Sequence, residues 1–102
     1  MIGNKALDTL GFLALYEDAH GQPPLLREIA EAVGLAGARP VWWHCRSWVR
    51  DGFVEELPDR HRKYKITDRG RWILELYRWD PSRLKTVPGQ PTLAAEVREG
   101  GD

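Results

Sequence analysis

Two groups of side chains between residues 39 and 65 suit the binding of a phosphate-bearing partner. The first group comprises Arg39, Trp42, Trp43, Arg46, Ser47 and Arg50. The second group comprises Arg60, His61, Arg62, Lys63 and Lys65. Arginine carries a planar fork of donors that fits a phosphate or the edge of a guanine. We therefore expect both groups to contact a nucleic acid, with the second group holding backbone phosphates.

The charge of the chain is concentrated in the segment that holds these groups. The chain as a whole is formally neutral. Residues 39–71 nevertheless carry nine basic and five acidic side chains, an excess of four positive charges before histidine is counted. A local basic patch matters more for phosphate binding than the total charge does.

The sequence offers no arrangement suited to catalysis. His44, Ser47 and Asp51 lie along one predicted helix, whereas a catalytic triad converges from separate elements. Glu55 and Glu56 are neighbours on a predicted strand and point to opposite faces. The three histidines are widely separated, and no glycine-rich phosphate loop is present. We expect no enzyme activity, no catalytic residue, no metal site and no cofactor.

The compartment is indicated by what the sequence lacks. Cys45 is the single cysteine, so neither an internal disulfide nor a cysteine-based zinc site can form. No apolar run is long enough to span a bilayer, and the N-terminus does not resemble a signal peptide. We expect a cytoplasmic protein with no membrane partner.

Apolar periodicity predicts three helices in the first half of the chain. The first covers residues 5–19 and is capped by Asn4, and the second covers residues 26–33 and stops at Gly34. After a turn of small residues, a third helix covers residues 39–51 and ends before Gly52.

A hairpin and a last helix are predicted to follow. Strands at 53–57 and 63–67 alternate apolar and polar side chains. Thr67 or Asp68 then caps a helix that reaches about residue 79.

This order of elements predicts a mainly α fold with a small antiparallel hairpin. It is the plan of a winged helix-turn-helix domain, with a three-helix core and a C-terminal helix. The domain is expected over residues 1–79. A tail over residues 80–102, which contains proline and glycine, is expected to be loosely ordered.

The five tryptophans are expected to have different surroundings. Trp48 and Trp72 share helix faces with other apolar residues, which predicts that both are buried. Trp79 is left open between core, dimer interface and a lid for the tail. Trp42 and Trp43 differ by about 100° around the third helix, so both cannot be buried. Contact with nucleic acid, with a protein or with the tail stays open for this pair.

Two stretches resemble known regulators. Residues 24–35, PLLREIAEAVGL, resemble the second helix and turn of the LexA repressor DNA-binding domain, and the spacing from Gly34 to Gly52 fits its recognition helix. Residues 64–70, YKITDRG, resemble the wing and last helix of MarR- or PadR-like regulators. LexA proteins carry a self-cleaving protease domain after this module. The present sequence ends before such a domain could form, so self-cleavage is not inferred.

Together these observations predict a regulator of transcription that binds double-stranded DNA. The third helix would enter the major groove and the hairpin would act as the wing. Surplus apolar residues on the last helix predict a homodimer, with a covering tail as the other reading. The alternative function is a winged helix that binds a protein, as a subunit or inhibitor of a larger machine without contacting DNA. It is motivated by Trp42, Trp43 and the neutral charge.

Overall fold

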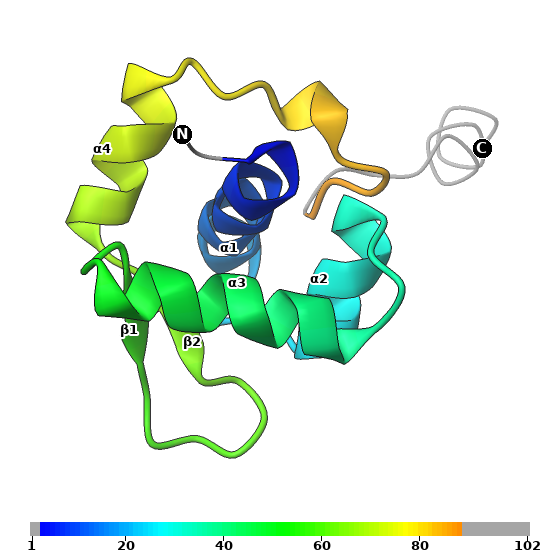
Figure 1. Ribbon diagram of the computed structural model, residues 1–102, viewed down its shortest axis with the longest axis vertical. Coiled ribbons are helices and arrows are strands. Elements are labelled where there is room, and N and C mark those ends of the chain that lie inside the picture. Colours follow the sequence, from blue (N-terminus) through cyan, green and yellow to red (C-terminus); the bar gives the residue numbers. More distant parts are fainter. Residues whose placement is uncertain (1–2, 89–102) are drawn as a thin grey trace, which may run out of the picture.

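A computed structural model describes residues 3–88. Its helices are α1 (Asn4–His20), α2 (Leu26–Val33), α3 (Ala38–Arg50) and α4 (Asp68–Leu76), and its strands are β1 (Val54–Glu56) and β2 (Tyr64–Ile66). A short 3₁₀ turn, Pro81–Arg83, follows α4. Helix α1 lies in the middle, with α3 across its front and α2 and α4 on either side (Figure 1). This architecture confirms the predicted mainly α fold with one hairpin.

Local sequence sets most helix ends where they were expected. Gly34 ends α2 with a left-handed φ of 84°, which a residue with a side chain rarely adopts. Thr67 caps α4, because its Oγ1 accepts a hydrogen bond from the Gly70 amide at 3.1 Å. The expected cap at Asn4 is wrong, since Gly3 takes that position and Asn4 is already helical.

Helix α4 ends at Leu76, earlier than the predicted 79. The chain leaves the helix because Arg78 adopts a positive φ of 51°. The amide of Trp79 then donates to the carbonyl of Leu74 at 2.9 Å, which closes the helix end. This turn sends the next residues back towards α1.

The hairpin is short and packs one face against the helices. Its antiparallel register pairs Val54 with Ile66 and Glu56 with Tyr64. Val54, Tyr64 and Ile66 are buried, whereas Glu55 is exposed. Each strand is one residue shorter at both ends than predicted: Leu57 and Lys63 belong to the connecting loop, and Phe53 and Thr67 flank the hairpin. The hairpin projects beside α3 as a wing (Figure 1).

The core lies between α1 and the elements around it. The most deeply buried side chains come from α1, α2, α3 and β2; they are Thr9, Leu10, Leu13, Ile29, Val41, Cys45 and Tyr64. Trp48 is also buried, as predicted, and its indole N–H donates to the carbonyl of Ala6 at 2.9 Å. That bond satisfies the polar end of an otherwise apolar side chain.

The prediction that Trp72 is buried is wrong, because 54% of it is exposed. Ile73 and Leu74 supply the buried face of α4 instead. A single apolar stripe is enough for a surface helix to pack on the core, so Trp72 on another side of α4 stays exposed. Leu76 and Tyr77 are exposed beside Trp72, which leaves an apolar patch on this helix.

Residues 77–88 cross from α4 over one end of α1 to α2 (Figure 1). The Trp79 ring packs directly on Gly11, and its Nε1 donates to Asp8 Oδ1 at 2.8 Å. Leu84 is buried, and the Lys85 amide donates to the carbonyl of Ala32 at 2.7 Å. This part of the expected loose tail is therefore packed, while residues 89–102 lie outside the described part of the chain.

Across residues 3–88, no helix combines the length and the apolar character that a membrane span would need.

Candidate nucleic-acid interface

Helix α3 has one buried side and one side that faces solvent. Val41, Cys45 and Trp48 point into the core, which fixes the orientation of the helix. The exposed side chains on the opposite side are Arg39, Trp42, Trp43, Ser47 and Arg50. The structure thus places five of the six predicted α3 side chains on one outer surface.

Arg46, the sixth, is bound to the wing. Its guanidinium forms an ion pair with Glu56 on β1, and Lys63 Nζ lies 3.5 Å from the other oxygen of the same carboxylate. The pair raises the pKa of Arg46, and the hydrogen bond from Arg46 lowers the pKa of Glu56. Sequence reasoning missed Glu56, because its role depends on how β1 lies beside α3.

Arg50 is far more accessible than Arg46, with 77% of its side chain exposed against 40%. Its contacts are weak: Nη2 lies 3.4 Å from Ser47 Oγ, and Nε lies 3.5 Å from Asp51 Oδ1. An exposed pair of this kind is worth little, so Arg50 can turn towards a phosphate or a base.

The wing loop is held in shape by one carboxylate. Asp59 Oδ1 accepts hydrogen bonds from the amides of His61 and Arg62, each at 2.8 Å, and these bonds lower the pKa of Asp59. The turn leaves Arg60 and His61 exposed at the tip, and Lys65 is exposed on β2. These three predicted contacts face solvent.

Arg62 faces the body of the domain. Its Nη1 donates to the Tyr16 hydroxyl at 3.1 Å and to the carbonyl of Pro23 at 2.9 Å, and it lies 3.5 Å from Glu28 Oε1. These contacts join the wing to the end of α1 and the start of α2. Sequence reasoning did not find the three partners, because they are at least 34 residues away along the chain.

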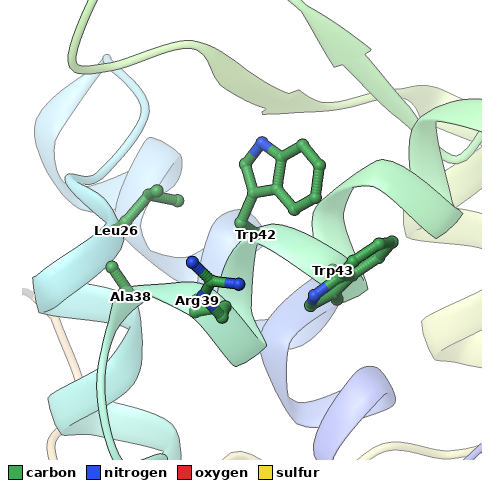
Figure 2. A pocket seen from close by; sticks show the side chains of 5 residues that line it. All are labelled: Leu26, Ala38, Arg39, Trp42 and Trp43. Atoms are coloured by element: carbon green, nitrogen blue, oxygen red, sulfur yellow. The ribbon is translucent and has the colours of Figure 1, made fainter.

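Trp42 and Trp43 form a small aromatic surface at the start of α3. Their ring centroids are 4.9 Å apart, and the planes meet nearly edge to face at 74°. Trp42 points towards the space between α2 and the wing, and Trp43 lies next to it, further along the exposed surface of α3 (Figure 2). Residues 86–88 lie instead beside Phe12, Tyr16 and His20, so the described part of the tail does not cover the pair.

Two further titratable side chains of α3, Cys45 and His44, have pKa values shifted by burial. Burial raises the pKa of the Cys45 thiol to about 12, which makes it a poor nucleophile. Burial lowers the pKa of His44, so it adds no charge to the surface at neutral pH. Within residues 3–88, no cluster of histidine, cysteine and carboxylate side chains could hold a metal ion.

The surface can be compared with a known family. The family model described as LexA DNA binding domain matches residues 4–63, which include all three core helices and the wing loop. The chain belongs to the LexA DNA-binding domain family. The predicted resemblance to LexA is confirmed, and with it the prediction of a DNA-binding regulator at the level of the family.

Curated LexA repressors match most of this chain. The LexA repressor of Limosilactobacillus reuteri is 33% identical over 96 residues, covering 91% of this chain and 46% of the relative. That of Limosilactobacillus fermentum is 32% identical over 99 residues, with the same coverage. That of Bacillus mycoides is 32% identical over 92 residues, covering 90% of this chain and 45% of the relative. The chain thus spans about half the length of the LexA repressors it matches. No solved structure matches it.

Proposed function

We propose that this chain binds double-stranded DNA with a sequence preference and regulates transcription, with α3 in the major groove and the hairpin as a wing. The supporting observation is the side of α3 that faces solvent, where Arg39 and Arg50 flank Ser47 and the two tryptophans. The diameter of an α-helix with its side chains is about 10–12 Å, which matches the major-groove width of about 12 Å, so α3 can lie in the groove.

The side chains divide into three roles. Arg39, Ser47 and Arg50 are free to contact base edges or flanking phosphates. Arg60, His61 and Lys65 on the wing contact the neighbouring backbone. The remaining cations, Arg46, Arg62 and Lys63, already have protein partners, so their contacts with DNA require those partners to be exchanged.

A mobility-shift titration tests this function. Wild-type protein is mixed with a random duplex and with a duplex selected from a random pool, each at two salt concentrations. We expect binding that weakens steeply with salt and favours the selected duplex. Arg50→Ala reduces the affinity, whereas Arg78→Ala, which removes an exposed charge beyond α4, leaves it unchanged. Failure to retard any duplex at low salt would refute the proposal.

We also propose that the exposed patch of α4 joins two copies of the chain. Trp72, Leu76 and Tyr77 are 54%, 58% and 52% exposed, even though residues 77–88 are in place. A two-fold dimer suits DNA sites whose half-sites repeat about one helical turn apart. Sedimentation should give twice the monomer mass for the wild type and a monomer for Leu76→Glu. A monomeric wild type would rule out the dimer.

The alternative, a module that binds a protein and no DNA, draws support from Trp43, which is 61% exposed. Aromatic side chains are frequent at the centres of protein interfaces. The same mobility shift separates the two functions, because this alternative predicts no binding of DNA even at low salt.

The cytoplasmic location of the protein stays a prediction.

A further inference from the structure

An apolar hollow lies between the start of α3 and the first turn of α2, on the proposed DNA-binding side. Its lining consists of Leu26, Ala38, Arg39, Trp42 and Trp43, and it is open to solvent (Figure 2). Four of these five side chains are apolar, and Arg39 stands at the rim as the single charge.

The described part of the chain leaves this hollow uncovered. Trp42 is 38% exposed and Trp43 is 61% exposed. Within residues 3–88, neither indole N–H has a hydrogen-bond partner among the contacts of the fold. Exposed apolar surface beside a charged rim is characteristic of a binding site. The Trp43 ring packs nearly edge to face against the Trp42 ring, and this contact restrains the position of Trp42 in the lining of the hollow.

The position of the hollow at the N-terminal end of α3 indicates which group of the DNA it would contact. In helix-turn-helix proteins the N-terminal residues of the recognition helix meet the base edges. In the major groove of unmodified DNA, the one apolar group on those edges is the C5-methyl of thymine. A ribose or phosphate would instead favour the cationic side chains further along α3 and on the wing.

We propose that this hollow receives the C5-methyl group of a thymine, with Leu26 and Trp42 as its walls, and so sets a thymine preference at one position of each half-site. This inference rests on the proposed DNA binding and assigns the base that the aromatic surface reads. Arg39 at the rim then lies close to the backbone or to the adjacent base pair.

The test replaces single thymines of a selected duplex by deoxyuridine, which removes the methyl group and retains the hydrogen-bonding pattern. For the wild type we expect one position per half-site at which deoxyuridine weakens binding by about 3- to 5-fold, the effect of one buried methyl group. In Trp42→Ala and Leu26→Ala this sensitivity falls below about 2-fold. Trp42→Phe retains part of it, and Glu31→Ala, which truncates an exposed side chain of α2 outside the hollow, retains all of it.

Two results would overturn the inference while leaving DNA binding intact. One is wild-type affinity that is indifferent to deoxyuridine at every thymine. The other is full sensitivity in both Trp42→Ala and Leu26→Ala, with melting curves showing that each variant is folded. Absence of binding to any duplex would refute the proposed function itself and the inference with it.

Discussion

Glu56 on the wing forms an ion pair with Arg46 on α3, and the same carboxylate also lies 3.5 Å from Lys63 Nζ. The carboxylate of Glu56 thus pairs with both Arg46 and Lys63, two cations that the sequence analysis assigns to DNA binding. A phosphate must compete with Glu56 for both of them.

We therefore expect Glu56→Gln to bind random duplex DNA more tightly than the wild type, by about 3- to 10-fold at low salt, since two cations become free for phosphate. Glu55→Gln is the matched control. It removes the same charge from the neighbouring, exposed position on β1. A fluorescence-anisotropy titration measures both variants. Equal gains in affinity would mean that only the total charge matters and that the ion pair does not restrain binding.

The wing gives a second comparison between neighbouring arginines. Arg62 of the wing loop points to the body of the domain and bonds to Tyr16 and Pro23, whereas Arg60 is exposed at the tip of the wing. We expect Arg62→Ala to lower the midpoint of thermal unfolding by about 3–6 °C. Arg60→Ala should leave the midpoint unchanged and reduce the salt dependence of DNA binding by about one phosphate contact. Circular dichroism and a salt series measure these effects. The reverse pattern would contradict the two assigned roles.

The sequence predicted the helices and the hairpin well, because periodicity, glycines and caps act over a few residues. It did not predict the surroundings of Trp72 or Trp79. Both depend on the turn at Arg78, where the chain leaves α4 and brings the Trp79 indole to Asp8. The outer side of α3 followed from helical spacing, whereas the partners of Arg46 and Arg62 required the path of the wing. Side chains from distant parts of the chain meet there in ways that local patterns do not encode.

The packing of Trp79 on Gly11 predicts an unusual substitution effect. Replacing glycine by alanine inside a helix ordinarily stabilises it by about 1 kcal/mol. Here a Cβ on Gly11 would collide with the Trp79 ring, so Gly11→Ala should destabilise the fold. In a Trp79→Ala background the same change should stabilise it by about 1 kcal/mol. Denaturant titrations of the wild type, the two single variants and the double variant measure the four free energies of unfolding. The same sign in both backgrounds would show that the ring does not rest on Gly11.

Cys45 predicts how stability depends on alkaline pH. Burial raises its pKa from 9.0 to about 12, so the folded state retains a proton that the unfolded state releases. Its contribution to stability is complete below pH 9 and is lost as the pH rises towards 12. Over this window the stability of the wild type should fall more steeply than that of Cys45→Ala, by up to about 1.4 kcal/mol per pH unit. Urea titrations at several pH values measure the difference. Parallel pH profiles would show that the thiol ionises freely in the fold.

The central claim is that α3 and the wing form the DNA-binding surface, and an NMR titration with a selected duplex tests it most directly. Amide resonances of residues 38–50 and 57–65 should shift on addition of DNA, while those on the patch of α4 around Trp72 should remain in place. Shifts centred on α4 with none on α3 would contradict the account.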